Sequence, residues 1–175
     1  MLQKHKKPVD QSPSVFVIMA IEKFCQPSSL MSVLDLPCGF GRNALCLAEK
    51  YHHVVCADYD PDVFVDRWFN TSHDLHPVLL DARKELPFKS ETFGLITTVH
   101  FYTIELFVKM HEILKTDGIV IFESVGGQGE NWRELPTKGN FRKNLDASFE
   151  ILYLQEKVVG PAKNNITVKM VARKK

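Results

Sequence analysis

One stretch near the start of the chain combines an apolar strand, a glycine turn and a helix, and it limits what the chain can fold into. Residues 32–48 read SVLDLPCGFGRNALCLA, in which the apolar start ends at Asp35 and Gly39 and Gly41 follow. Glycine has no Cβ, so its backbone can turn sharply or lie close against a ligand. A strand followed by such a turn directs backbone N–H groups and a helix N-terminus into a crevice. We expect that crevice to bind a nucleotide-like ligand.

The length of 175 residues suits one domain with a substantial core. We expect residues 1–11 to form a flexible N-terminal arm and residues 12–175 a single domain. The net charge is +1, and two local basic patches lie at the two ends of the chain. Such a balance gives no broad field toward nucleic acid or a membrane, so neither is expected as a partner. We expect a monomer or a weak dimer.

The cysteine pattern and the first residues of the sequence indicate where in the cell the protein is expected. Cys25, Cys38, Cys46 and Cys56 show no Cys-x-x-Cys pairing, which is typical of free thiols in a reducing cytoplasm. Basic residues and Pro8 stand where a secretory signal would have its apolar core. No apolar run approaches the roughly 20 residues that a membrane-spanning helix needs. We therefore expect a cytoplasmic protein.

Apolar runs of strand length alternate with segments of helical spacing, which predicts an α/β fold. The expected architecture is a Rossmann-like, mostly parallel sheet of seven strands with helices on both faces and a C-terminal antiparallel hairpin. Ser12-Pro13 is expected to open the first helix and Asp60-Pro61 a later helix through Trp68. A turn is expected at Asp117-Gly118. The expected strands include residues 54–57, 77–80, 93–99, 119–122, 149–155 and 166–172.

The acidic residues near the crevice indicate which kind of nucleotide-like ligand it binds. The pattern Gly39-x-Gly41-x-x-Ala44 fits the dinucleotide fingerprint. Asp35, however, lies where a pyrophosphate would sit and would repel it. Asp58 and Asp81 end the next two expected strands, so three carboxylates are expected at the crevice. They suit a ligand with a ribose, an aromatic base and a cationic end.

The sequence resembles the class I S-adenosylmethionine-dependent methyltransferases over roughly residues 12–172. Within that superfamily it is most similar to small bacterial tellurite-resistance-type methyltransferases. The superfamily motifs are Val33-Leu-Asp-Leu-Pro-Cys-Gly-Phe-Gly41, Ala57-Asp-Tyr59, Leu80-Asp-Ala82 with Leu86-Pro-Phe88, and Lys115-Thr-Asp-Gly118. The narrower resemblance is carried by Ser12-Pro-Ser-Val-Phe16, Asp35-Leu-Pro-Cys-Gly39, and Asn131-Trp-Arg-Glu-Leu-Pro136 with Gly139.

The resemblance implies S-adenosylmethionine as cofactor and a small-molecule methyl acceptor. It places Asp35 near the cofactor's ammonium, Asp58 on the ribose hydroxyls, and Asp81 on the adenine amino group. His100 would lie near the departing methyl as the catalytic residue. The full set implied for the cofactor is Asp35, Pro37, Cys38, Gly39, Gly41, Asp58, Tyr59, Asp81, Ala82 and Val99. Phe16, Tyr102, Trp132 and Arg133 are expected at the acceptor site, the last two on a lid loop within residues 125–140.

The chain departs from the superfamily at two places. Pro37 stands where glycine is commoner, so the turn is expected to be stiffer. His100-Phe-Tyr102 replaces the Asn/Asp-Pro-Pro-Tyr/Phe motif of enzymes that methylate amino groups of bases or glutamine. Methylation of nucleic-acid amino groups is therefore not expected.

Other functions remain open on the sequence alone. The chain could be a cofactor-binding module without catalysis or, on the fingerprint, an NAD-dependent oxidoreductase. No metal is expected, since His52-His53 looks like a loop pair with no third ligand nearby in sequence, and His73 and His76 fall in a polar stretch. No motif names the methyl acceptor or its nucleophilic atom.

Overall fold

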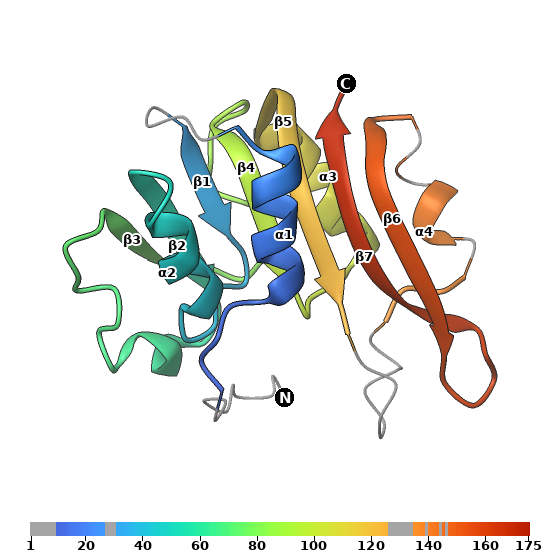
Figure 1. Ribbon diagram of the computed structural model, residues 1–175, viewed down its shortest axis with the longest axis horizontal. Coiled ribbons are helices and arrows are strands. Elements are labelled where there is room, and N and C mark those ends of the chain that lie inside the picture. The colour runs from blue at the N-terminus through green and yellow to red at the C-terminus, as the bar shows by residue number, and fades with distance from the viewer. Residues whose placement is uncertain (1–9, 27–30, 126–134, 139, 144, 146) are drawn as a thin grey trace.

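The computed structural model is built around one sheet, which has seven strands among the residues described (Figure 1). Those residues are 10–26, 31–125, 135–138, 140–143, 145 and 147–175. The strands lie in the order β3-β2-β1-β4-β5-β7-β6. Their bounds are β1 Ser32–Asp35, β2 His53–Asp58, β3 Leu75–Leu79, β4 Phe93–Val99, β5 Leu114–Ser124, β6 Phe149–Val159 and β7 Asn165–Lys174.

The direction of the strands divides the sheet into two parts. Strands β1 to β5 pair with one another in parallel. Strand β7 is antiparallel to both of its neighbours, β5 and β6, and forms a hairpin with β6 (Figure 1). The predicted mostly parallel sheet with a C-terminal antiparallel hairpin is confirmed. The carboxyl ends of β1, β2, β3 and β4 meet at one edge, where ligands bind in open α/β sheets.

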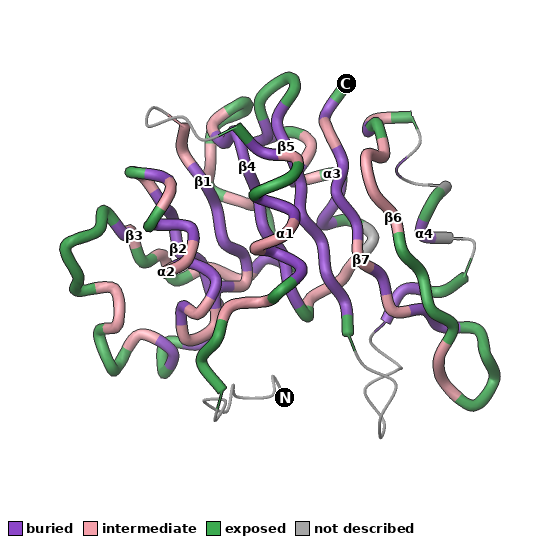
Figure 2. The backbone as a smooth tube through the Cα atoms, viewed as in Figure 1, coloured by how far each residue is buried: buried purple, intermediate pink, exposed green. Residues whose placement is uncertain are grey.

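Helices cover both faces of the sheet, as predicted. Helices α1, Val15–Phe24, and α2, Arg42–Ala48, lie on one face, and α3, Ile104–Ile113, and α4, Asn140–Lys143, on the other (Figure 1). Each face has its own apolar core, one containing Ile21 and Leu47, the other Met110 and Phe141. The central strands are buried between the two layers (Figure 2). Among the described residues, no helix has the length and apolar character that crossing a membrane requires.

Helix α1 is capped two residues later than predicted. The Ser14 hydroxyl, not that of Ser12, accepts from the backbone N–H groups of Phe16 (3.2 Å) and Val17 (3.3 Å). The backbone N–H of Ser12 instead donates to Asp10 Oδ1 at 2.8 Å. Both serines suit a helix N-terminus. Because Ser12 lies in a local turn with Asp10, Ser14 caps the helix instead.

The helix expected from Asp60 through Trp68 is a single 3₁₀ turn, Pro61–Phe64. Asp60 caps it as predicted, with Oδ1 accepting from the Asp62 N–H at 3.0 Å. After this turn the chain folds back, and the Trp68 indole N–H donates to the Val63 carbonyl at 2.7 Å. An indole that binds backbone in this way favours the short turn over a longer helix.

The turn expected at Asp117-Gly118 lies inside strand β5. Phe93 pairs with Leu114 and Leu95 with Ile119, so β5 holds extra residues between two paired positions. Asp117 has φ +63° within this irregular stretch. The sequence located the turn residues, but strand β5 pairs with β4 on both sides of them.

Trp68 packs against the second glycine of the loop after β1. A Cβ built on Gly41 would lie 2.2 Å from a carbon of the Trp68 ring, and Gly41 has φ +82°. Any side chain there would overlap the ring and strain the backbone. Gly41 therefore serves packing as well as the turn.

We expect Gly41→Ala to destabilise the protein by roughly 2–4 kcal/mol, because about 1–2 kcal/mol of left-handed strain adds to the overlap with Trp68. Gly160→Ala is the matched control, since Gly160 has φ +81° at the end of the β6–β7 hairpin. Urea unfolding of both variants measures the difference. Equal losses at the two glycines would contradict the packing role of Trp68.

Candidate functional site

The loop after β1 is held by both neighbouring strands. The Leu36 N–H donates to the Thr97 carbonyl of β4 at 3.0 Å. The Cys38 N–H donates to the Ala57 carbonyl of β2 at 2.9 Å, and the Gly39 N–H to Asp58 Oδ2 at 2.9 Å. These bonds fix the glycine turn at the carboxyl edge of the sheet.

The two glycines of this loop face different surroundings. A Cβ on Gly39 would meet nothing within 4 Å, whereas one on Gly41 would meet Trp68. Gly39 has φ +50° and lies beside the Asp58 carboxylate. Sequence reasoning placed both glycines against the cofactor, but only Gly39 has open space beside it.

A pocket lies at the same edge and collects residues from the ends of four strands. Its empty space is about 440 Å³ with its open mouth included. Six of the predicted site residues line it: Pro37, Asp58, Tyr59, Asp81, Ala82 and His100. The other lining residues are Leu36, Leu80, Arg83 and Phe101. Cys38 and Val99 are buried next to lining residues, at 4% and 5% exposure, and are not in the lining.

Asp35 is fully buried at the end of β1. Its Oδ1 accepts from the Thr97 hydroxyl at 2.7 Å, while Oδ2 has no hydrogen-bond partner among the described residues. Burial raises the pKa of the Asp35 carboxyl to about 7; the Thr97 hydrogen bond opposes this rise and the nearby Asp58 adds to it. An unpartnered, buried carboxylate oxygen is costly unless it is protonated or meets a cation.

Asp58 and Asp81 differ from Asp35 in their partners. Asp58 accepts from the Gly39 N–H and, at 3.0 Å, from the Asp60 N–H. Asp81 forms a two-pronged ion pair with Arg83, at 2.8 and 2.6 Å. The hydrogen bonds from Arg83 lower the pKa of Asp81 to about 2. The expected three carboxylates do lie at this edge, but Asp81 carries a cationic partner that the sequence did not reveal.

His100 directly follows β4 at the rim of the pocket. Its backbone has φ +63°, and its N–H donates to the Glu123 carbonyl at 2.8 Å. Desolvation lowers the pKa of the His100 imidazole, the positive charge of Arg42 lowers it further, and Glu123 raises it. The ring is therefore neutral near pH 7, a form that can accept a proton.

Sequence reasoning missed a polar network beside His100. Glu123, buried at the end of β5, accepts from the Ser14 hydroxyl and pairs with Lys169 of β7 at 3.3 Å. Asn43 of α2 accepts from the Ser14 N–H at 2.9 Å. The position of Glu123 at the carboxyl end of a parallel strand is the one sequence signal that points to it.

The two expected acceptor-site residues that the structure describes, Phe16 and Tyr102, are not in the pocket lining. Phe16 is 4% exposed and packs with Tyr153, ring centroids 5.7 Å apart. Tyr102 is half-buried and packs on the rings of Phe107 and Phe122. Both rings pack against aromatic neighbours, and their expected role as acceptor contacts stays a prediction.

Trp132 and Arg133, and with them the expected lid, lie outside the described residues.

Comparison with protein families and solved structures bears on this architecture. Residues 33–118, about half of the chain, match the family described as "Methyltransferase domain". None of the curated proteins matches the sequence. The matched span runs from the core of β1 to Gly118 within β5 and so contains the glycine loop and the pocket lining.

Several solved structures share the fold. An S-adenosylmethionine-dependent methyltransferase from Mesorhizobium loti is 16% identical with a TM-score of 0.70, covering 91% of this chain and 98% of that one. TehB from Haemophilus influenzae is 18% identical with a TM-score of 0.66, covering 91% and 61%. The [4+2]-cyclase SpnF is 16% identical with a TM-score of 0.69, covering 90% and 79%.

The sheet order, the glycine loop and the pocket define an enzyme of the Rossmann-like methyltransferase class. The matching domain and these structures support a class I S-adenosylmethionine-dependent methyltransferase fold for the chain.

The site fits the cofactor of this class on two observations. Gly39 leaves a space that a Cβ would fill, so a ligand can lie against the backbone there. Asp35 Oδ2 is a buried carboxyl oxygen without a hydrogen-bond partner in the described part of the chain, which suits a neighbouring cationic group.

We expect Asp35→Asn to remove a pH dependence of stability. Folding raises the pKa of Asp35 from near 4 to about 7, so between these values the folded state holds more protons. Wild-type stability therefore falls, relative to that of the variant, as pH rises from about 4 to 7, by a few kcal/mol at most. Urea unfolding at several pH values measures this, with exposed Asp117→Asn as the control. Parallel curves for wild type and Asp35→Asn would refute it.

Proposed function

We propose that the protein transfers a methyl group to a small-molecule acceptor by direct displacement. The observation that carries the proposal is a single pocket at the sheet edge whose lining includes Asp58 and Tyr59 on one side and His100 on the other. The net charge of +1 supports a small acceptor over nucleic acid. Four free cysteines support a reducing, cytoplasmic location.

The chain's own residues provide the cofactor's contacts in this proposal. The Asp58 carboxylate accepts two backbone N–H groups at the pocket and, in this proposal, also meets the ribose hydroxyls. Tyr59 gives an aromatic face, and Arg83 lies 5.8 Å from its ring centroid. Asp81 meets the adenine amino group only if it shares its oxygens with Arg83 or releases it.

When bound, S-adenosylmethionine supplies a methyl group on a cationic sulfur. Because the leaving group is neutral, alignment and exclusion of water matter more than acid catalysis. Phe101 and Leu36 provide apolar walls to the pocket. His100, neutral near pH 7, accepts a proton from an acceptor hydroxyl or amine.

The cofactor contact at Gly39 gives the first test. We expect Gly39→Ala to weaken binding of S-adenosylhomocysteine at least tenfold by calorimetry, because its Cβ would fill the open space of the loop. The Gly160→Ala variant carries a similar positive φ away from the pocket and should bind as wild type. Wild-type affinity in Gly39→Ala would remove this loop from the cofactor site. A calorimetric signal with NADH but not with S-adenosylhomocysteine would overturn the assignment.

The catalytic role gives the second test, made with an acceptor from a small-molecule panel that releases S-adenosylhomocysteine. His100→Asn suits the position, because asparagine tolerates a positive φ. If His100 is the base, we expect turnover to fall about 10²–10⁴-fold with unchanged affinity for S-adenosylhomocysteine. The acidic limb of the pH profile should also disappear. Unchanged turnover would remove His100 from the mechanism, and cofactor binding without turnover on any acceptor would favour a non-catalytic module.

A further inference from the structure

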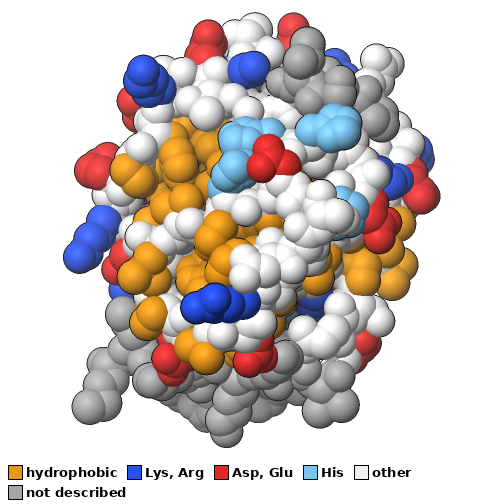
Figure 3. Space-filling model, turned by 90° about the vertical axis from the view of Figure 1, so that its left-hand side faces the viewer, with side chains coloured by type: hydrophobic (Ala, Val, Ile, Leu, Met, Phe, Trp, Pro, Cys, Tyr) orange, Lys and Arg blue, Asp and Glu red, His pale blue; other side chains and the backbone are white. Residues whose placement is uncertain are grey.

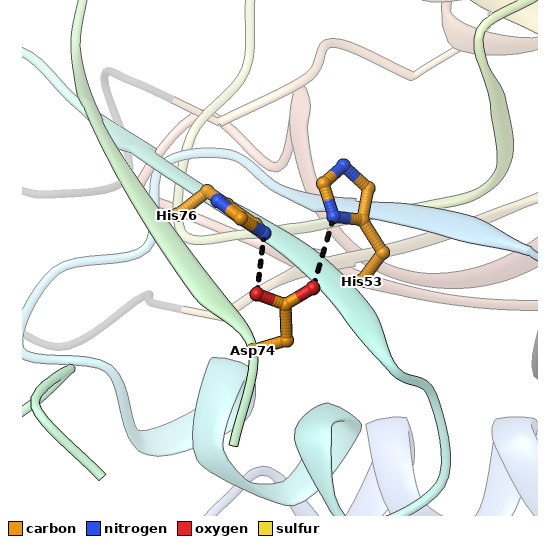
Figure 4. A group of neighbouring side chains, drawn as sticks. All are labelled: His53, Asp74 and His76. Atoms are coloured by element: carbon orange, nitrogen blue, oxygen red, sulfur yellow. Dashed lines mark hydrogen bonds and ion pairs between the residues drawn. The ribbon is translucent and has the colours of Figure 1, made fainter. Parts of the chain in front are cut away.

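Three side chains at the outer edge of the sheet form a cluster that methyl transfer does not use. His53, Asp74 and His76 offer one ligand atom each, and these atoms lie within 4.8 Å of one another. Both imidazole rings turn toward the carboxylate (Figure 4). Histidine side chains gather around an acidic group on this face of the molecule (Figure 3). Elsewhere in the described part of the chain, no three such side chains come together in this way.

Strand pairing explains why the sequence did not reveal the cluster. His53 begins β2, and some 20 residues separate it from Asp74. The parallel register pairs Val54 with Leu75 and Val55 with His76, and the Val54 N–H donates to the Asp74 carbonyl at 3.1 Å. The next step of this register brings His53 beside Asp74, and His76, two residues on, shares its face. The two partners of His53 thus come from the neighbouring strand and the residue just before it, and His52 is not part of the cluster.

Two of the distances in the cluster are close to those between ligands of one small metal ion. His53 Nδ1 lies 3.4 Å from Asp74 Oδ2, and His76 Nε2 lies 2.9 Å from Asp74 Oδ1. Zinc bonds of about 2.0–2.2 Å in a tetrahedron place neighbouring ligand atoms about 3.3 Å apart. Side-chain rotations alone can therefore bring the three atoms onto one ion.

The charge of the carboxylate favours a cation at this place. The two imidazole rings lie 4.2 Å apart and share one carboxylate, so two protonated rings would repel each other. His76 Nε2 is shielded from solvent and lies 2.9 Å from Asp74 Oδ1. Neutral imidazoles and a carboxylate are the ligands that zinc and its neighbours prefer.

We propose that His53, Asp74 and His76 bind one divalent transition-metal ion, for which Zn²⁺ is the probe, with water completing the coordination. The site is structural. It lies at the amino ends of β2 and β3, whereas the pocket lies at their carboxyl ends, about 17 Å away along β2. The ion would fasten the edge strand β3 to β2. This proposal does not depend on the methyl acceptor.

Calorimetry of the full chain with ZnCl₂, after treatment with a chelator and under reducing conditions, tests the site. We expect one ion per chain, and at least about tenfold weaker binding in His76→Ala and in Asp74→Asn. Zn²⁺ should also raise the unfolding temperature of wild type but not of these variants. The outer positions of these residues leave both variants able to fold, which the unfolding curves without metal check.

His52→Ala is the matched control, because it removes a neighbouring imidazole that is not part of the cluster. It should bind Zn²⁺ as wild type does. MgCl₂ should give no binding, since Mg²⁺ prefers oxygen ligands. No stoichiometric binding by wild type at 100 µM Zn²⁺, on the order of a weak site's affinity, would overturn the proposal. Equal affinity in wild type, His76→Ala and Asp74→Asn would do the same by placing the ion on other groups, such as the cysteines.

Discussion

The hydrogen bond from the Gly39 N–H to Asp58 Oδ2 joins the turn after β1 to the end of β2, and the rest of the site depends on it. The other oxygen of Asp58 accepts from Asp60, which caps the following 3₁₀ turn. That turn returns Trp68 to the face of Gly41. The Asp58 carboxylate therefore positions both the glycine loop and the segment that packs on Gly41. These contacts leave the open side of Gly39 free for a ligand.

Much of the fold follows from the sequence because its signals are local. Strand β4 lies at the predicted residues 93–99, since an apolar run bounded by turns has few other readings. The misplaced cap at Ser12 and the helix expected through Trp68 depended on competing partners, Asp10 and Val63. These partners are close in sequence, yet only the folded geometry decides which of them is chosen. Helix and capping propensities rank the possible structures but do not determine which of them forms.

The site residues also divide into those that the sequence could place and those that it could not. The carboxylates of Asp35, Asp58 and Asp81 could be placed because parallel strands bring their carboxyl ends to one edge. The Ser14–Glu123 bond joins residues 109 apart, and no spacing rule anticipates it. The same limit applies to aromatic residues. Whether a ring faces a ligand or a core depends on neighbours from distant strands, as it does for Phe16.

The three carboxylates differ in what they contribute to holding a cation. Arg83 neutralises Asp81, so that residue adds little net attraction at the pocket. Asp35 has a pKa of about 7 because of burial, and it is therefore only partly charged at neutral pH. A cationic ligand near Asp35 would favour its ionised form, so binding would release a proton and strengthen as pH rises through 7. If Asp35 lies near the cofactor's ammonium, as the sequence predicts, cofactor binding would be coupled to pH through this carboxyl, a property that a count of acidic residues could not reveal.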